Sequence, residues 1–318
     1  MDFNAMLKAG KAEIKLPLMD VDPITGERID PIRDAIFESA RIEGLKEDPR
    51  PHMGASVIGG DCKRLTWLNF RWAAPEEFEG RTLQLFDRGK REEIPVIANL
   101  RRAGFEVIDE HGDVSPIGLT NTPDGEQYRV DLGGHVSGSL DGFLKGHADA
   151  PKTWHVLEIK THGLKSFKKL VAEGVYVSKY QHWVQMQIYM LKTGLTRALY
   201  YAVCKDNDDI YTERVKLDKT KAKQLVEDAQ IMALSPRMYE PISADPSYYR
   251  CKAFKCSAYE FCHQGKQIAP VNCRTCAYSV PTPGSTWECT RYDNAEIPYE
   301  AQLRGCDEYI IHADLIPE

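Results

Sequence analysis

The chain has 318 residues, of which 42% are hydrophobic and 28% are charged, and its formal net charge is −6. This is an ordinary composition for a folded globular protein, and the negative balance excludes a protein that coats nucleic acid through bulk basicity. No apolar run approaches the length of a membrane span and the N-terminus lacks the apolar region of a secretory signal, so we expect a cytoplasmic protein with no membrane partner.

The N-terminal third predicts an extension followed by two helices. Residues 1–55 contain prolines and charges around one short helix. The next helix is expected to begin after residues 59–61, and it carries Cys62. A longer helix runs from Thr82 to Ala103 and is ended by a glycine. It contains GKREE, residues 89–93, whose acidic side chains on their own indicate an exposed helix face.

Two adjacent strands are predicted between Gly134 and Thr161, where GGHVSGSLDGFLKG and TWHVLEIKT are separated by a short polar break. Side chains alternate along a strand, so Glu158 and Lys160 point to one face. If the break closes the strands into a hairpin, Asp141 lies beside Glu158 and the two carboxylates form a site for a divalent cation. A neighbouring ammonium can orient a water or steady charge that develops on a phosphate.

The same three residues also fit a simpler interpretation. Asp, Glu and Lys on one face of a hairpin are more often a solvated surface with a weak ion pair. The glycines and serines before Asp141 favour a ligand site, because they let another backbone or a ligand approach closely. The pattern by itself leaves both interpretations open.

Two helices are predicted after this stretch. Residues 163–171 form a short basic helix, which is usually a solvated face but beside a metal site can hold a DNA backbone. A longer helix is capped by Ser178 and ended by Gly194, and Trp183 and Tyr189 within it are best explained as core residues. The lysines of the first helix are Lys165, Lys168 and Lys169. Further strands are expected at residues 105–109, 128–132, 198–206 and 209–217, with another helix at Lys219–Leu234.

The nine cysteines are concentrated near the C-terminus. Cysteine this dense in a chain without a secretion signal favours metal binding over disulfides. A first group contains Cys251, Cys256 and Cys262, which is one thiolate short of a closed site of four ligands. Cys204 has no evident role.

A second cysteine group lies in the tail from residue 269 to residue 318. Cys273 and Cys276 form a Cys-x2-Cys knuckle, which places two thiolates on one tetrahedral ion. With Cys289 and Cys306 they predict a zinc-ribbon-like module, which a tail this small needs as a staple. The histidines that are alternatives to a cysteine in either group are His263 and His312.

In this order, the aspartate, the Glu-x-Lys strand, the glutamine-rich helix and the cysteine groups resemble the PD-(D/E)XK nuclease superfamily. The likeness is to its RecB-like and lambda-exonuclease-like branches, including members with an iron-sulfur cluster, and it spans roughly residues 56–263. It implies an α/β fold in which a mixed central sheet is flanked by helices, with a small cysteine-rich C-terminal module. The implied parts are an N-terminal extension (1–55), a nuclease core (56–250), an iron-sulfur clip (251–268) and a zinc-ribbon-like tail (269–318).

The resemblance also implies roles for individual residues. In such nucleases the aspartate and the Glu-x-Lys bind the metal and activate water, so Asp141 and Glu158 would hold Mg²⁺ or Mn²⁺ beside Lys160. Leu140 replaces the proline of the family name. The family's first motif maps to GKREE and makes Glu93 a further metal ligand, with Glu92 as the alternative.

Two more sets of residues follow from the same resemblance. The family's active-site glutamine maps to Gln185, four residues before a tyrosine, with Gln181 and Gln187 as alternatives, and Tyr180 of that helix is implied as a DNA contact. Cys62 would complete a [4Fe-4S] site with the first cysteine group. The step from Cys251 to Cys256 is longer than the family's usual spacing.

The implied function is a Mg²⁺- or Mn²⁺-dependent DNA exonuclease for end processing and recombination in a bacterium or its phage, acting then in the host cytoplasm. Its partner would be linear DNA, single- or double-stranded, and a recombination protein or a second copy of the chain fits the same hypothesis. The alternatives are a non-catalytic nucleic-acid-binding protein with two metal clips and a restriction-like endonuclease.

Overall fold

A computed structural model of the chain describes residues 30–109, 128–252 and 256–317. These residues belong to two compact units. The smaller unit contains residues 30–47 and 78–86 of the described chain, and the larger contains residues 48–77 and the described residues from 87 onward. Within these ranges, no helix has both the length and the apolar content needed to cross a bilayer.

The smaller unit contains helix α2 (Pro31–Gly44) and the first turns of α4 (Gly80–Arg102). The side chain of Asp30 caps α2 by accepting a hydrogen bond from the Arg33 N–H, and Pro31 begins the helix where its missing N–H costs nothing. The two segments pack very closely at Gly80, where an added Cβ would overlap the backbone of Phe37. Glycine is therefore required at this crossing.

The larger unit is built on a mixed sheet. Among the described residues its strand order is β2-β5-β6-β7-β8, and neighbours run antiparallel except for β6 and β7, which are parallel. The hairpins expected around the polar break and at residues 198–217 are both present, as β5–β6 and β7–β8. The strands are β2 (Glu106–Ile108), β5 (Gly142–Lys145), β6 (His155–His162), β7 (Arg197–Cys204) and β8 (Ile210–Lys216).

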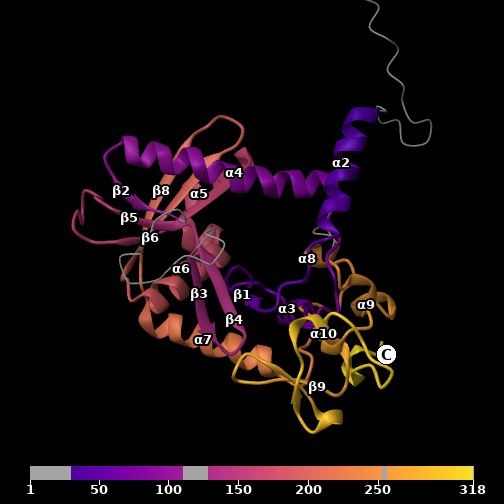
Figure 1. Ribbon diagram of the computed structural model, residues 1–318. Helices are drawn as coiled ribbons and strands as arrows, with labels where there is room; N and C mark the ends of the chain where they lie inside the picture. Colours follow the sequence, from indigo (N-terminus) through magenta and orange to yellow (C-terminus); the bar gives the residue numbers. More distant parts are fainter. Residues whose placement is uncertain (1–29, 110–127, 253–255, 318) are drawn as a thin grey trace, which may run out of the picture. The chain divides into compact units, whose positions relative to one another are not determined.

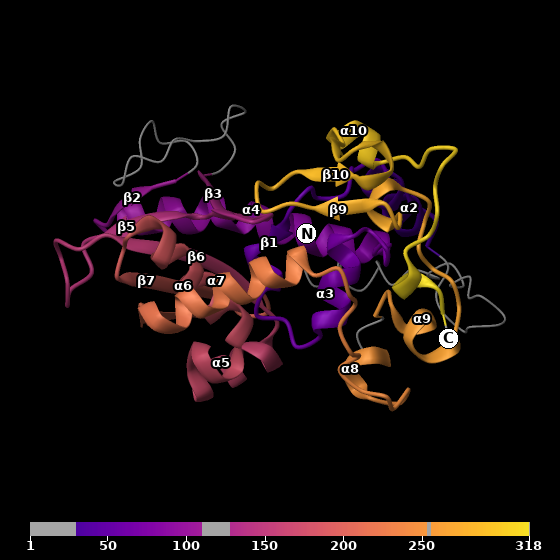
Figure 2. The same ribbon diagram turned by 90° about the horizontal axis from the view of Figure 1, so that it is seen from below.

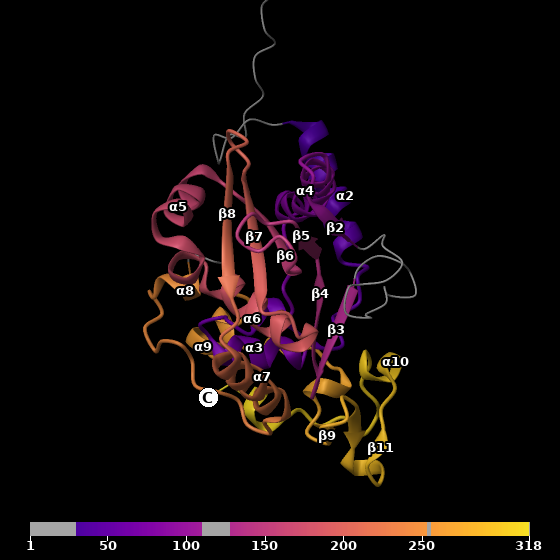
Figure 3. The same ribbon diagram turned by 90° about the vertical axis from the view of Figure 1, so that its left-hand side faces the viewer.

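Helices cover both faces of this sheet. Leu157 and Ile159 of β6 face a core to which α4 contributes Val96, Ile97 and Leu100. The other face carries Val156 and packs against α5 (Leu164–Ser178) and α6 (Tyr180–Thr193), while α7 (Lys219–Leu234) packs on α6. In Figure 3 α4 and α5 lie on opposite sides of the central strands. The predicted fold class, a mixed sheet flanked by helices with a cysteine-rich C-terminal module, is confirmed.

A smaller sheet feeds the chain into the central one. Its order is β1-β4-β3, with β1 (Met53–Gly54), β3 (Tyr128–Gly133) and β4 (Val136–Leu140), and Figure 1 shows β3 and β4 side by side. The short helix η1 (Ala55–Val57) follows β1. Asp141 lies between β4 and β5, so it stands where the chain passes from one sheet to the other.

The helices after β6 differ from the sequence expectation in one respect. The basic helix continues to Ser178, and the Ser178 hydroxyl donates a hydrogen bond to the Gly174 carbonyl at 2.6 Å. Ser178 therefore belongs to α5, and the expectation that it caps α6 is wrong, since Lys179 occupies that position. Gly194 ends α6 in the left-handed conformation with φ 71°, as predicted.

The C-terminal part consists of short elements that pack on α3 (Lys63–Phe70) and α7. Trp287 packs with Phe70 and Met232, and Phe261 and Leu315 pack with Trp67. Figure 2 shows β9 and β10 beside each other, with α10 next to them. The elements are α8 (Tyr249–Lys252), α9 (Tyr259–Gln264), η2 (Cys273–Thr275), β9 (Ser279–Pro281), β10 (Trp287–Cys289), η3 (Thr290–Tyr292), β11 (Ala295–Glu296), α10 (Tyr299–Gln302) and η4 (Ala313–Leu315).

A buried arginine ties this region to the rest of the unit. Arg274 is 1% exposed, and its guanidinium donates hydrogen bonds to the carbonyls of Phe70 (2.9 Å) and Pro51 (2.8 Å) and to the side chain of Gln302 (2.9 Å). It also lies 3.8 Å from the centre of the Trp72 ring. Burial lowers the pKa of this guanidinium, and the hydrogen bonds and ring faces offset the cost of its desolvation.

We expect the substitution Arg274→Ala to lower the free energy of unfolding by about 3 kcal/mol or more, because it leaves buried carbonyl oxygens without donors and opens a cavity. Urea denaturation followed by tryptophan fluorescence measures this loss. Arg291→Ala is the matched control, since that exposed arginine forms a surface ion pair with Glu308, and it should leave the midpoint unchanged. Equal midpoints for the two variants would contradict the assignment.

Candidate active site

The β5–β6 hairpin brings Asp141, Glu158 and Lys160 together. Gly142 pairs with Leu157, so Asp141 is level with Glu158, and its Oδ2 accepts a hydrogen bond from the Ile159 N–H at 2.7 Å. The Lys160 ammonium lies 3.9 Å from this same oxygen and forms a close ion pair with the Glu158 carboxylate. Three charged groups thus meet at the end of one hairpin.

Gly142 allows this approach. Its φ is 148°, and a Cβ at this position would lie 2.7 Å from the carbonyl oxygen of Ile108 on β2. Residues other than glycine rarely adopt such a φ, and here they would also collide with the neighbouring strand. The glycine after Asp141 is therefore needed to turn the chain from β4 into β5.

Glu158 is the least solvated of the three groups. Its side chain is 0% exposed, and burial raises its pKa to about 7, assisted by the charge of Asp141 and opposed by that of Lys160. Burial works to lower the pKa of Lys160, but the charges of Glu158 and Asp141 outweigh it and hold that pKa above its ordinary value. Neither oxygen of Glu158 accepts a well-aligned hydrogen bond from the described residues, so its partner is the Lys160 ion pair.

This donor set fits a divalent cation. A buried carboxylate with unused oxygen lone pairs beside a second carboxylate offers the hard ligands that Mg²⁺ and Mn²⁺ prefer. In the described part of the chain, no three or more His, Cys, Asp or Glu side chains are already spaced to hold a metal ion. A Mg²⁺ site often uses only one or two carboxylates and completes its shell with water and substrate phosphate, which is the shell that Asp141 and Glu158 leave open.

Gln185 reaches this centre through Tyr189. Its side-chain amide donates to the Tyr189 hydroxyl at 3.2 Å, and Glu158 is close enough to help burial raise the pKa of that hydroxyl. The alternatives bond elsewhere: Gln181 donates to the Ser56 carbonyl, and Gln187 joins the end of β8 to the start of α7. The predicted role of Gln185 stays a prediction.

The first-motif residues lie on the part of α4 that follows residue 87. Gly89 passes close to Thr161 of β6, with 3.9 Å between an added Cβ and the Thr161 hydroxyl. The charge of Glu92 adds to the rise in the pKa of Tyr201, which faces α4. Glu93 is partly buried on the same helix, and its metal-ligand role stays a prediction.

A polar network beside Lys160 went unnoticed in the sequence. The Tyr200 hydroxyl lies 2.9 Å from His162 Nε2 and 2.8 Å from His182 Nδ1. Burial, with the nearby charges of Lys179 and Lys160, lowers the pKa of His162 to about 4 and that of His182 to about 3, so both rings are neutral at pH 7. His162 shares the face of Glu158 and Lys160 by strand alternation, a signal that could have revealed it.

The predicted DNA contacts lie on α5 and at the start of α6. Lys165, Lys168 and Lys169 are exposed, and Lys169 pairs with Glu173 at 3.7 Å. Tyr180 is 37% exposed. These side chains are available to a large ligand.

The first cysteine group is brought together across the sequence. Burial is the largest cause of a raised pKa at Cys251, Cys256 and Cys262, and in each case the charge of Cys62 adds to it. The pKa of Cys256 rises to about 11. The Arg64 guanidinium lies 3.9 Å from Cys262 Sγ and works against the rise at that thiol. These thiols are therefore near enough to affect one another's pKa, although the described residues do not hold them at metal-ligand spacing.

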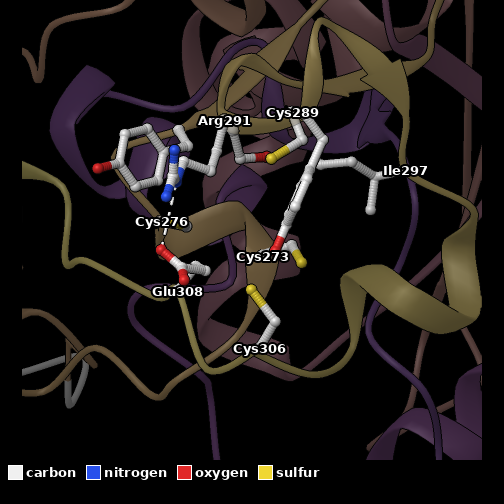
Figure 4. Close-up of a pocket in the computed structure, with 10 residues that line it drawn as sticks. Cys273, Cys276, Cys289, Arg291, Ile297, Cys306 and Glu308 are labelled. Atoms are coloured by element: carbon white, nitrogen blue, oxygen red, sulfur yellow. Dashed lines mark hydrogen bonds and ion pairs between the residues drawn. The ribbon is translucent and has the colours of Figure 1, made fainter.

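The second cysteine group lines one pocket. Figure 4 shows Cys273 and Cys306 pointing toward each other, and Cys276 and Cys289 line the same space. Burial, followed by the charges of the other cysteines, raises the pKa of Cys273 to about 11. The His312 ring packs edge-on against Trp67, while its backbone N–H donates to the carbonyl of Thr275, next to Cys276, at 2.9 Å. Cys204 is buried in β7, apart from both groups.

Comparison with known proteins gives distant structural likenesses. No family model matches the chain, and no curated protein matches its sequence. An alkaline exonuclease from Laribacter hongkongensis is 16% identical over 70% of this chain and 98% of its own, with a TM-score of 0.39. The same enzyme in complex with dAMP is 16% identical over 57% of this chain and 86% of its own, with a TM-score of 0.38. The protein SSO0001 is 17% identical over 71% of this chain and 93% of its own, with a TM-score of 0.40. Likenesses at this distance assign neither family nor activity.

The lowered pKa values of His162 and His182 predict a pH-dependent stability. The unfolded chain binds protons at these rings below about pH 6.5, whereas the folded chain does not until about pH 4, so stability should fall as the pH drops through this window. We expect His182→Gln to reduce the slope of the free energy of unfolding against pH by about 1.4 kcal/mol per pH unit. Urea denaturation between these pH values measures it.

The control for this experiment is Gln181→Ala, which changes the neighbouring residue and removes no titratable group. Its slope should match that of the unsubstituted chain. An unchanged slope for His182→Gln would show that this ring is protonated in the folded protein, contrary to the expectation.

Proposed function

We propose that this chain is a divalent-cation-dependent nuclease that hydrolyses phosphodiester bonds of DNA, acting from strand ends as an exonuclease. The proposal rests on the carboxylate of Glu158, which is fully buried, lies beside Asp141 and, within the described part of the chain, forms its ion pair with Lys160. A solvated surface patch, the simpler interpretation, would not place a carboxylate at 0% exposure.

Each residue has a role that its position supports. Asp141 and Glu158 would hold Mg²⁺ or Mn²⁺, which when bound would supply Lewis-acid charge and an activated water. Lys160 places a positive charge next to both carboxylates, where it can orient the attacking water or stabilise charge that develops on the phosphate. Gln185 would position Tyr189 by its hydrogen bond to the tyrosine hydroxyl. That hydroxyl lies so close to Gly138 that a side chain at position 138 would collide with it.

The cysteine groups would support the fold. We propose a [4Fe-4S] cluster on Cys62 with Cys251, Cys256 and Cys262, and zinc on the group that contains Cys273. Thiolates are the ligands of both metals, and each group supplies the four that a closed site needs. Raised thiol pKa values mean that metal must displace protons, so loading should improve as the pH rises.

Substitution of the central residues tests the activity. We expect Asp141→Asn and Lys160→Met each to slow Mg²⁺-dependent digestion of linear DNA about a hundredfold or more, because the first removes a ligand of the cation and the second removes positive charge beside the reacting phosphate. Release of labelled nucleotides measures the rate. Asp149→Asn is the control, since this exposed carboxylate near the β5–β6 turn pairs with Arg214 and should leave the rate unchanged.

Two outcomes would contradict the proposal. DNA binding without digestion by the unsubstituted chain would indicate a non-catalytic binding protein. Equal cleavage of closed circular and linear DNA would indicate an endonuclease.

Metal analysis tests the cysteine groups. We expect purified protein to contain about one zinc per chain and to be brown from iron. Cys276→Ser should lose the zinc and lower Tm, and Cys62→Ser should lose the colour, whereas the isolated Cys204→Ser should retain both metals. Full metal content in Cys276→Ser and Cys62→Ser would refute the assignment.

A further inference from the structure

Three aromatic side chains meet at the junction of α5 and α6 and remain open to solvent. The Tyr176 ring lies edge-on to Tyr180 and Trp183, with ring centres 5.8 and 5.0 Å apart, and Tyr180 stacks on Trp183 at 5.7 Å and 18° between planes. Tyr176 is 57% exposed and Tyr180 is 37% exposed. We call these three residues the aromatic platform.

A kink in α5 places Tyr176 in the platform. Gly174 has φ 72° and ψ 173°, which breaks the helix one turn before its end. The Val175 N–H that loses its helical partner donates instead to the Glu213 carboxylate at 2.8 Å, and Tyr211 donates to the same oxygen at 2.6 Å. The bend is therefore fixed from β8, and the platform is held in a defined geometry.

The platform is also fixed to the main hydrophobic core, through Trp183. Trp183 packs against the main core while its other ring contacts are with Tyr176 and Tyr180. Apolar rings left this open cost solvation free energy, and a self-contained core cluster would be buried more deeply. A rigid set of partly exposed rings is instead the form of surface on which planar ligands stack.

Positive charges lie on the segments that carry the platform. Lys165, Lys168 and Lys169 are exposed on the same helix, and Glu173 is the acidic side chain among them. Lys179, between Tyr176 and Tyr180, is held at Ser166 by a hydrogen bond of 2.5 Å. In a chain of net charge −6 this is a local concentration of cations. Lysine is depleted at protein–protein interfaces, whereas cations beside open rings suit a polyanion that carries bases.

The same charges connect the platform with the active site. Lys179 and Lys160 both lower the pKa values of His162 and His182, so these two rings lie between the platform's lysine and the lysine of the carboxylate pair. His182 and Trp183 are adjacent on α6 and turn to different neighbours, Tyr200 and Tyr176. A strand with a phosphate at Lys160 would therefore have the positive charge of Lys179 nearby.

We propose that the platform of Tyr176, Tyr180 and Trp183 binds unpaired bases of a DNA strand by stacking, with the α5 lysines on its phosphates. The inference rests on the proposed function and adds to it that the preferred substrate has a single-stranded segment next to the cleaved bond. The bases are recognised by their ring faces, which all bases possess, so sequence preference should be weak.

Binding to normal and abasic strands tests the proposal separately from cleavage. A fluorescent oligo(dT) of about 16 nucleotides and an abasic strand of equal length and charge are titrated with the full chain, with no divalent cation added. We expect the abasic strand to bind about tenfold more weakly, and Tyr176→Ala to reduce affinity for oligo(dT) about tenfold while leaving the abasic strand unaffected. Tyr176→Phe should retain full affinity.

The matched control is Val177→Ala, which shortens an adjacent apolar side chain that is 65% exposed and outside the platform. It should bind both strands as the unsubstituted chain does. Circular dichroism and Tm verify that each variant is folded, and Tyr180→Ala is the second variant should Tyr176→Ala unfold.

The outcomes separate the two proposals. Equal affinity of the unsubstituted chain for both strands would overturn the stacking inference. Retention of the preference for oligo(dT) in both Tyr176→Ala and Tyr180→Ala would overturn it too. Neither result would affect the proposed nuclease function, which digestion of linear DNA tests. Loss of self-association in Tyr176→Ala without loss of oligo(dT) affinity would likewise overturn it, and would make the platform a contact between copies. Failure of the proposed function shows separately, as absent digestion with base-dependent binding intact.

Discussion

The burial of Glu158 beside Lys160 is the constraint around which the central sheet is organised. A carboxylate removed from water is costly unless an opposite charge accompanies it, and here Lys160 supplies that charge while the nearby Asp141 carboxylate opposes it. Because the pKa of Glu158 lies at about 7, the group is divided between charged and neutral forms near neutral pH. A cation bound there would displace the proton, so cation binding and proton release are coupled.

The surroundings of the pair are arranged to keep its charge balance. His162 and His182 share the Tyr200 hydroxyl and stay neutral, so they add no positive charge next to Lys160. Lys179, at the junction of α5 and α6, is a further positive charge near these rings. The face of β6 that carries Glu158 is therefore largely polar, while the opposite face, with Leu157 and Ile159, is ordinary apolar core under α4.

The C-terminal region that holds most of the cysteines is fixed in place by a few buried side chains. Their region contains short elements and little regular structure, so its packing on α3 and α7 is fixed by buried Arg274 and by Trp287 rather than by a large core of its own. Burial raises the pKa of Cys273, so this thiol keeps its proton more strongly than an exposed one. A bound metal ion would displace that proton and would add a staple to a region too small for a large core.

Periodicity and spacing in the sequence predicted the β5–β6 hairpin, the shared face of Glu158 and Lys160, and the glycine that ends α6. These are local properties, because strand alternation and a left-handed helix end follow from neighbouring residues. The expected Ser178 cap was wrong, since its hydroxyl bonds back into a helix whose kink at Gly174 is held by Glu213, a residue distant in sequence.

The amino-acid sequence by itself determined which residues can carry charge, thiol chemistry and turns, and in which order. Only the tertiary structure decided that Glu158 is buried, that His162, Tyr200 and His182 share one hydroxyl, and that Tyr176 meets Trp183 in the open. The physical reason is that desolvation, pKa and ring contacts depend on atoms contributed by distant segments, and no local pattern encodes which segments will meet.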